Sequence, residues 1–169
     1  VEKLLRTERS ARVAYLCVME ARWPRLVVFD LDYTLWPLWV DTHVDPPLKR
    51  TRHINQVVEG TRDAHSHSGV DSHYRSTIQF RTCRTTHVSE ILFLLRQNNV
   101  KIGAASRTQA PRVARQALAG LMITPPASQE LPVSALSLFD YMEIYPGSKV
   151  AHFRRLAQLS EIPFHDMRT

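Results

Sequence analysis

The chain has 169 residues, of which 44% are hydrophobic and 22% charged, and its formal net charge is +6. This length suits one domain with its own core, and no stretch reaches the roughly 18 apolar residues that a membrane span needs. The N-terminal region mixes acidic and basic residues and lacks the apolar centre of a secretory signal. The two cysteines lie far apart in the sequence, which argues against a disulfide framework. These absences predict a cytoplasmic protein without a membrane partner.

The positive charge suits nucleic acid, an anionic surface or a phosphorylated substrate, and charge alone does not choose between them. The arginines are scattered, and no run interleaves basic residues with aromatic ones as in single-strand binders. A basic nucleic-acid-binding module therefore stays an alternative interpretation, and we do not expect nucleic acid as the main partner.

The first strong element follows an N-terminal extension, residues 1–23, whose composition allows a helix. Residues 25–30 form a short apolar run rich in β-branched residues, which predicts a strand buried on both faces. Several prolines in residues 31–50 predict loops or a small flap. A single domain is expected over residues 24–169.

Residues 52–86 are rich in Ser, Thr, His and Arg and show little apolar periodicity. This composition predicts an irregular or disordered insertion. His65, His67 and His73 with Asp71 have the residue types of a metal site, but the segment offers no scaffold to fix their geometry. We interpret them as part of a polar loop.

Beyond this insertion, apolar residues recur alternately at helical and at strand spacing. The expected elements are a helix over 88–98, a strand over 100–105, a helix over 108–119, a strand over 139–145 and a helix over 148–159. Thr108 is the expected N-cap of the second helix, with Pro111 in its first turn. Strands that alternate with helices predict an α/β fold with a doubly wound, Rossmann-like parallel sheet.

Polar residues follow each of the three expected strands. They are Asp30 and Asp32 after the first strand, Ser106 and Arg107 after the second, and Lys149 after the third. Parallel sheets bind ligands outside the carboxyl ends of their strands. We therefore expect these five side chains to meet at one rim of the sheet.

Three segments carry a resemblance to a known family: Asp30–Pro37 (DLDYTLWP), Ala105–Thr108 (ASRT) and Ile144–Lys149 (IYPGSK). In this order they resemble the first three motifs of the haloacid dehalogenase superfamily. Together with Trp39–Pro47 (WVDTHVDPP), they resemble more narrowly its magnesium-dependent phosphatase family. The resemblance implies a fold of the haloacid dehalogenase type with a minimal cap and an open site.

The residue types at this rim suit phosphoryl transfer. Asp30 can act as a nucleophile that forms an aspartyl-phosphate. Asp32 can protonate the leaving oxygen and then activate water. Ser106 can hydrogen-bond a phosphate oxygen, Lys149 supplies a point charge, and Arg107 lies at the edge of the pocket.

Magnesium is the cofactor that the resemblance implies. An oxygen of Asp30 and the backbone carbonyl of Asp32 would hold Mg²⁺, which would shield the carboxylate from the phosphate. The superfamily also has an acidic fourth motif, which the sequence does not reach before Thr169, and Asp166 comes too early to replace it. We therefore expect a C-terminally incomplete domain with weak Mg²⁺ binding, low activity and one unpaired edge of the Asp30 strand.

Several other residues have alternative interpretations. Trp36 is grouped with the substrate-binding residues, although packing over the core is the slightly favoured interpretation, and Trp39 has the same two interpretations. His43 is a candidate for the substrate loop. Cys83 and Cys17 lack the arginine six positions on that a cysteine-dependent phosphatase needs.

The sequence therefore predicts a Mg²⁺-dependent phosphomonoester hydrolase that works through an aspartyl-phosphate. Its partner would be a phosphorylated small molecule or phosphoprotein, and the resemblance implies phosphotyrosine or sugar phosphates. One alternative is a relic of the fold that binds phosphate or regulates without turnover. The other is the basic nucleic-acid-binding module.

Overall fold

The computed structural model describes residues 22–50, 56–59, 77–79, 82–83, 86–125 and 131–169. Almost all of the expected N-terminal extension lies outside these residues. The same holds for the polar group of His65, His67, His73 and Asp71.

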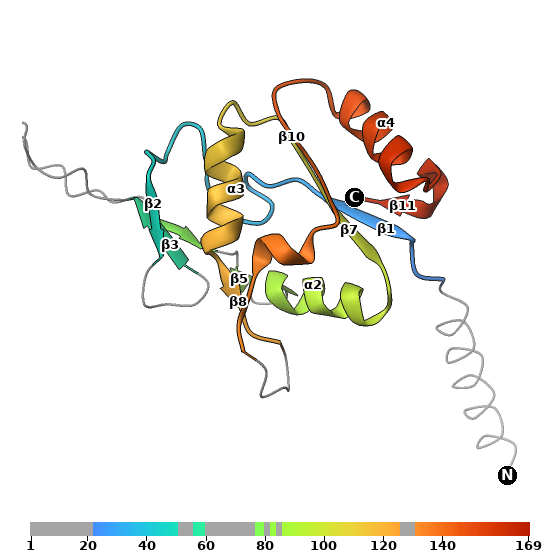
Figure 1. Cartoon of the computed structure of the whole chain (residues 1–169), viewed down its shortest axis with the longest axis horizontal. Coiled ribbons are helices and arrows are strands. Elements are labelled where there is room, and N and C mark those ends of the chain that lie inside the picture. Colours follow the sequence, from blue (N-terminus) through green and yellow to red (C-terminus); the bar gives the residue numbers. More distant parts are fainter. Residues whose placement is uncertain (1–21, 51–55, 60–76, 80–81, 84–85, 126–130) are drawn as a thin grey trace, which may run out of the picture.

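A four-stranded parallel sheet forms the centre of the fold (Figure 1). Its strands, in spatial order, are β10 (Tyr141–Ile144), β7 (Lys101–Ser106), β1 (Leu26–Phe29) and β11 (Met167–Arg168). The helices that connect them are α2 (Val88–Gln97), α3 (Pro111–Gly120) and α4 (Lys149–Ser160). The predicted α/β class with a parallel sheet is confirmed, and the predicted strands and helices lie within a few residues of the observed ones.

The sheet is covered on both faces, with α2 and α3 on one side and α4 on the other (Figure 1). β1 explains this arrangement because its side chains alternate. Leu26 and Val28 pack with Leu156 of α4, whereas Val27 and Phe29 pack into the larger core on the opposite face. Burying one such aliphatic side chain contributes about 1.5–3 kcal/mol. The apolar run around β1 therefore holds two layers of helices and fixes where the strand ends.

β11 corrects the expectation that the Asp30 strand has an unpaired edge. Leu26 pairs with Met167 and Val27 pairs with Arg168, both in parallel register. β1 is thus flanked by β7 on one side and β11 on the other. β11 has two residues, and both pair with β1. The 3-10 helix η2 (Phe164–Asp166) directly precedes it.

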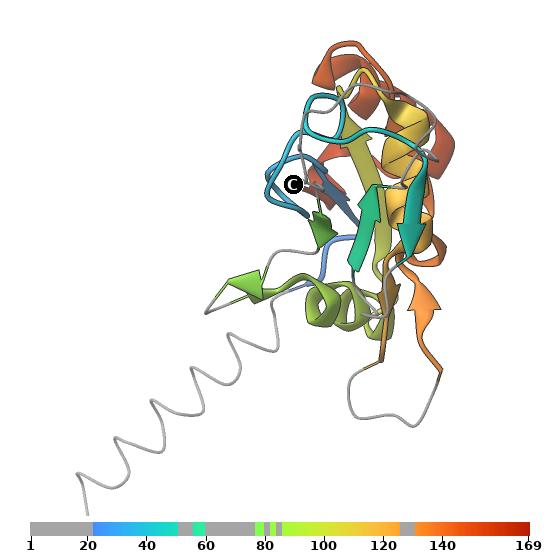
Figure 2. The ribbon, with the colours of Figure 1, turned by 90° about the vertical axis from the view of Figure 1, so that its left-hand side faces the viewer.

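A second, antiparallel sheet lies beside α3 and differs from the irregular segment expected over residues 52–86 (Figure 2). Its strands are β2 (Leu48–Arg50), β3 (Gln56–Glu59) and β4 (Thr77–Gln79). Leu48, Val57 and Ile78 are buried, one in each strand, and they join this sheet to the hydrophobic core. A Cβ on Gly120 would lie 2.4 Å from Cγ1 of Val57, so α3 approaches β3 at a residue without a side chain.

Smaller elements complete the described part of the chain. Two antiparallel pairs and a 3-10 helix were not expected: β5 (Thr82–Cys83) with β6 (Thr86–His87), β8 (Met122–Ile123) with β9 (Val133–Ser134), and η1 (Ala135–Leu138). Within the described residues, no helix is long and apolar enough to cross a membrane.

The helix starts determine which residues reach the rim of the sheet. Thr108 is not the N-cap of α3 as expected: Ala110 holds that position without a side-chain cap, and Pro111 begins the helix. The Oγ1 of Thr108 instead accepts a hydrogen bond from Ala110 N at 3.2 Å. At α4, Ser148 is the N-cap and its Oγ accepts from Ala151 N at 3.1 Å. This cap fixes the start of α4, and therefore Lys149, at the rim.

Candidate active site

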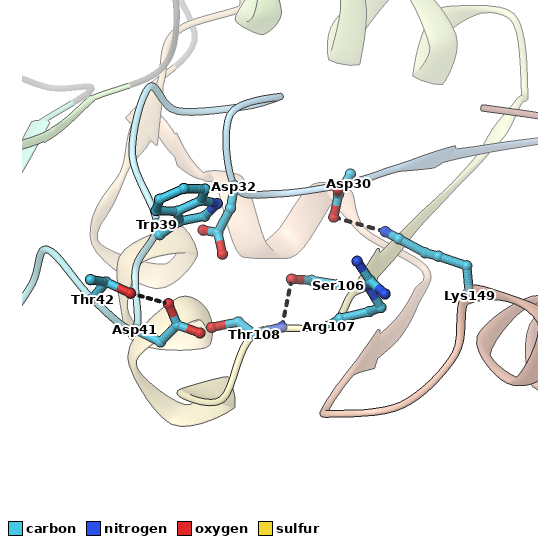
Figure 3. Close-up of a pocket in the computed structure, with 9 residues that line it drawn as sticks. All are labelled: Asp30, Asp32, Trp39, Asp41, Thr42, Ser106, Arg107, Thr108 and Lys149. Carbon is cyan, nitrogen blue, oxygen red and sulfur yellow. Dashed lines mark hydrogen bonds and ion pairs between the residues drawn. The ribbon is translucent and has the colours of Figure 1, made fainter.

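An open pocket of about 360 Å³ lies at the carboxyl ends of β1 and β7, beside the N-terminus of α4 (Figure 3). Carboxylates, hydroxyls and two cations share this pocket with one tryptophan. The lining residues are Asp30, Asp32, Trp39, Asp41, Thr42, Ser106, Arg107, Thr108 and Lys149. The structure therefore brings together all five polar residues that the sequence placed at the strand ends.

Asp30 follows β1 directly and is paired with a cation from α4. Its Oδ1 lies 2.8 Å from Nζ of Lys149 and accepts a hydrogen bond from Leu31 N at 3.0 Å. Lys149 Nζ also donates to the carbonyl of Ala105 at the end of β7. Among the described residues, Oδ2 of Asp30 has no hydrogen-bond donor. Oδ2 is therefore the oxygen available to a ligand in the pocket.

Asp32 is held from one side only. Its Oδ1 accepts from the indole Nε1 of Trp36 at 2.7 Å and from Val40 N at 3.1 Å. Burial raises the pKa of Asp32 above its ordinary value, and these two hydrogen bonds act in the opposite direction. In the described part of the chain, Oδ2 has no donor, so a proton on this carboxyl group would be carried by Oδ2. An acid with a raised pKa suits general acid catalysis.

The loop after β7 supplies the opposite wall of the pocket. Ser106 and Thr108 are almost fully buried, and Thr108 N donates to Oγ of Ser106 at 3.3 Å. Arg107, between them, is exposed and lines the pocket. A hydroxyl and a guanidinium on a rigid loop are suitable donors for phosphate oxygens.

The two tryptophans have different positions. Trp36 is fully buried and donates a hydrogen bond to Asp32 from within the core, and it does not line the pocket. Trp39 is 52% exposed and lines the pocket, with its ring stacked on His43 at a centroid distance of 5.7 Å and edge-on to Tyr33 at 5.0 Å. The packing alternative therefore describes Trp36, and Trp39 is the tryptophan that a bound ligand would meet.

Three residues of the pocket were not predicted as site residues from the sequence: Asp41, Thr42 and Thr108. Asp41 Oδ2 accepts from Gln109 N at 2.9 Å, and Oδ1 accepts from Oγ1 of Thr42 at 3.0 Å. The bond from Gln109 is the main reason why the pKa of Asp41 lies below its ordinary value. The only sequence signal for Asp41 and Thr42 was their place inside Trp39–Pro47, the stretch that carries part of the family resemblance.

The donor set of the pocket fits a hard cation. Mg²⁺ prefers oxygen ligands, keeps several waters and is usually held by one or two carboxylates together with substrate phosphate. Asp30 offers a free carboxylate oxygen at the rim, where its side chain is 44% exposed. The described residues contain no group of three or more His, Cys, Asp or Glu that would form a complete metal cage.

Asp30 and Asp32 follow β1 of the parallel sheet, Ser106 ends β7 and Lys149 begins α4. This arrangement defines a hydrolase of the haloacid dehalogenase class. Comparison with known proteins agrees. The family model described as Acid Phosphatase matches residues 22–168. The chain therefore belongs to the acid phosphatase family, and the prediction of a phosphatase family from three short motifs is confirmed.

Relatives with curated names support this assignment. A haloacid dehalogenase-like hydrolase superfamily protein of Schizosaccharomyces pombe is 38% identical over 150 residues, which cover 89% of this chain and 76% of that protein. Magnesium-dependent phosphatase 1 of Homo sapiens is 40% identical over 147 residues, which cover 87% of this chain and 66% of the human protein. The chain thus spans about two thirds to three quarters of these relatives.

Among solved structures, the chain is similar to the N-terminal part of a Bacteroides fragilis protein that contains a phosphatase domain in complex with Mg. The sequence identity is 12% and the TM-score is 0.49, over 90% of this chain and 31% of the other.

Proposed function

We propose that the chain hydrolyses phosphomonoesters with Mg²⁺ through a phosphorylated Asp30. The observation that carries this proposal is the arrangement of Asp30, Lys149 and Ser106 around one open pocket. The same pocket contains Asp32, whose pKa is raised by burial. The family and the names of the fission yeast and human relatives support the same chemistry.

The first step uses Asp30 as nucleophile and Asp32 as acid. One carboxylate oxygen of Asp30 attacks phosphorus, the bond from phosphorus to the leaving oxygen breaks, and that oxygen takes the proton from Asp32. Lys149 and Arg107 offset the negative charge of the phosphoryl oxygens, while Ser106 donates a hydrogen bond to one of them.

The second step reverses the role of Asp32. Its carboxylate takes a proton from water, the water oxygen attacks phosphorus, and the bond from phosphorus to Asp30 breaks. Inorganic phosphate leaves, and both carboxyl groups return to their starting states. The hydrogen bonds from Trp36 and Val40 keep Oδ1 of Asp32 turned away, so that Oδ2 faces the reacting oxygen in both steps.

The carboxylate of Asp30 and the backbone carbonyl of Asp32 would hold Mg²⁺. When bound, the metal supplies the positive charge that lets an anionic nucleophile approach an anionic phosphate. The name of the human relative supports this cofactor.

An aryl phosphate such as phosphotyrosine is the substrate class that the pocket wall favours over a sugar phosphate. The exposed ring of Trp39, supported by Tyr33 and His43, offers an aromatic surface next to the two aspartates. Aromatic pairs add about 0.5–1.5 kcal/mol beyond area burial, which would lower KM for an aryl ester by about two- to twelvefold relative to a sugar phosphate.

The decisive experiment measures phosphate release from an aryl phosphate with Mg²⁺, with chelator, and with Asp30→Asn. We expect turnover that needs Mg²⁺ and that disappears in the variant. Mass spectrometry of acid-quenched protein should detect a phosphoryl group on the peptide that contains Asp30. Binding of inorganic phosphate without Mg²⁺-dependent turnover would instead support the relic interpretation.

A further inference from the structure

The segment from residue 36 to residue 43, here named the flap, is joined to the rest of the pocket by hydrogen bonds on two sides, and one side includes the bond from Nε1 of Trp36 to Oδ1 of Asp32. On one side, Val40 N donates to Oδ1 of Asp32 at 3.1 Å. On the other side, Oδ2 of Asp41 accepts from Gln109 N at 2.9 Å, across 68 positions of sequence. The flap is therefore joined to the loops after both β1 and β7.

The Gln109 end of this second attachment is rigid. Within the loop after β7, Thr108 N donates to Oγ of Ser106, and Ala110 N donates to Oγ1 of Thr108. Ser106 and Thr108 are 1% and 4% exposed. The bond from Gln109 thus connects the loop after β7 to the exposed end of the flap, residues 41–43.

The flap carries the aromatic ring that lines the pocket. Trp39 is 52% exposed, and its local contacts are with neighbours on exposed chain: its backbone N donates to Nδ1 of His43 at 3.0 Å, and its ring stacks on the same residue. The chain is buried at Val40 and again at Val44, so the bond to Gln109 holds the exposed stretch between them, which includes His43, the residue on which the ring of Trp39 stacks.

A negative charge is unfavourable in a pocket that receives an anion, so its presence needs a reason. Asp41 remains ionised because its oxygens accept hydrogen bonds from Gln109 N and from Oγ1 of Thr42. Both contacts are with the protein itself, and a hydrogen bond with the side chain of Thr108 also lowers the pKa of Asp41. Its contacts therefore indicate a role in placing the flap.

We propose that Asp41 is a positioning residue, which fixes the flap and Trp39 at the pocket by accepting the hydrogen bond of Gln109 N. The proposal rests on the proposed phosphatase function and adds to it a residue that determines how well the leaving group is bound. The hydrogen bond, rather than the charge of Asp41, is the essential feature.

Two substitutions separate the hydrogen bond from the charge. Asp41→Ala removes both, whereas Asp41→Asn loses the charge but keeps an amide oxygen for Gln109 N. We expect Asp41→Ala to raise KM for an aryl phosphate by about tenfold with a smaller change in kcat, because Gln109 N loses its acceptor. Asp41→Asn should stay within about threefold of the parent. Equal KM increases in both variants, or none in Asp41→Ala, would overturn the proposal.

The matched control is Glu90→Ala, which removes the same charge from an exposed position in the first turn of α2. It should leave KM and kcat at the parent values. Circular dichroism and thermal melting of each variant exclude global unfolding as the cause of a higher KM.

A second measurement does not depend on turnover. In a Trp23→Phe background, which removes the other exposed tryptophan, acrylamide quenching reports Trp39, because Trp36 is fully buried. Asp41→Ala should increase the quenching constant, and Asp41→Asn and Glu90→Ala should not. If the parent shows no turnover but this pattern holds, the phosphatase proposal fails while the role of Asp41 in placing the flap stands. Equal quenching of Trp39 in Asp41→Ala and the parent would show that the flap does not need this bond.

Discussion

The ammonium group of Lys149 lies 2.8 Å from Oδ1 of Asp30 and donates at the same time to the carbonyl of Ala105. One cation at the start of α4 thus contacts the ends of both central strands, β1 and β7 (Figure 3). The contact orients Asp30 before substrate arrives, and it places positive charge where a transferring phosphoryl group would gain negative charge.

Replacing Lys149 should therefore reduce the rate more than substrate binding. We expect Lys149→Met, which keeps most of the apolar stem, to lower kcat by about 10²–10³-fold, the usual effect of removing one preorganised electrostatic partner. Lys149→Arg should restore part of the rate because it keeps the charge at a different geometry. Steady-state kinetics with an aryl phosphate and Mg²⁺ measures both. Arg154→Met, an exposed charge on the same helix, is the control and should leave kcat unchanged. A kcat within threefold of the parent in Lys149→Met would contradict this role.

The indole of Trp36 should influence the pH dependence through Asp32. Its hydrogen bond lowers the pKa of Asp32, against the larger effect of burial, which raises it. Asp32 must be protonated to act as the acid, so kcat/KM should fall as pH rises through its pKa. Trp36→Phe removes the bond, raises that pKa further and should move the alkaline limb to higher pH.

A pH profile of kcat/KM with saturating Mg²⁺ tests this shift. Trp23→Phe is the matched control, because Trp23 is 45% exposed and does not line the pocket. Trp36 is fully buried, so thermal melting must confirm that Trp36→Phe is folded at each pH. An alkaline limb that stays in place, or moves to lower pH, in a folded variant would show that Trp36 does not control Asp32.

Three strands of the central sheet, β1, β7 and β10, were predictable because their signals are local, whereas the pairing of the two-residue β11 with β1 was not. The apolar run through β1, the helical spacing in α2 and the proline before α4 can each be read within a dozen residues of sequence. The β2, β3 and β4 sheet was not predictable in this way. Val57 of β3 and Ile78 of β4 are buried and pair with each other. This pairing joins two segments that are separated by polar sequence. Such pairing leaves no local periodicity.

The same distinction explains the site. Asp30 and Lys149 were predictable because they follow strands, and parallel strands bring their carboxyl ends together. Asp41 depends on Gln109 N, a backbone donor 68 positions away, and no spacing rule connects the two. Trp36 and Trp39 have the same residue type in the same flap, and only the packing of the flap determines that Trp36 is buried and Trp39 exposed.

Asp140, just before β10, should link the stability of the fold to pH. Its carboxylate contacts Arg96 at 2.8 Å and Lys101 at 3.1 Å, and it accepts from Ile102 N at 2.9 Å. Burial alone would raise the pKa of Asp140, but these three partners outweigh it and lower the pKa. A lowered pKa contributes stability above the unfolded-state value of about 3.9, and that stability is lost as pH falls through the folded-state value.

Asp140→Ala should therefore reduce the free energy of unfolding by about 1–3 kcal/mol at neutral pH, mainly because Ile102 N loses its partner. The difference from the parent should shrink below pH 4. Urea unfolding at several pH values provides the measurement. Asp166→Asn is the control, because its pair with Arg25 spans 3.8 Å and Arg25 is half exposed, so the loss should stay within about 1 kcal/mol. A loss in Asp140→Ala that does not depend on pH would argue against this linkage.

His152 should make the start of α4 sensitive to acid. Its ring is fully buried, neither ring nitrogen has a hydrogen-bond partner among the described residues, and it packs edge-on against Tyr145 at 4.4 Å. Burial is the main cause of its lowered pKa, and the charges of Lys149 and Arg107 act in the same direction. The Tyr145 carbonyl and Glu143 oppose this effect without reversing it.

A histidine with a lowered pKa is neutral in the folded state and takes up a proton on unfolding. Stability should therefore fall as pH drops below the unfolded-state value of about 6.5, because the unfolded chain then binds the additional proton. His152→Leu removes the titrating group and two unsatisfied polar atoms while keeping an apolar side chain against Tyr145. The unfolding midpoint in urea should then change less between pH 7.5 and pH 5.5, both values chosen to bracket about 6.5. His165→Gln, whose side chain is 80% exposed, should keep the dependence of the parent. If His152→Leu loses as much stability on acidification as the parent does, the acid sensitivity arises elsewhere, since only this variant removes a buried histidine.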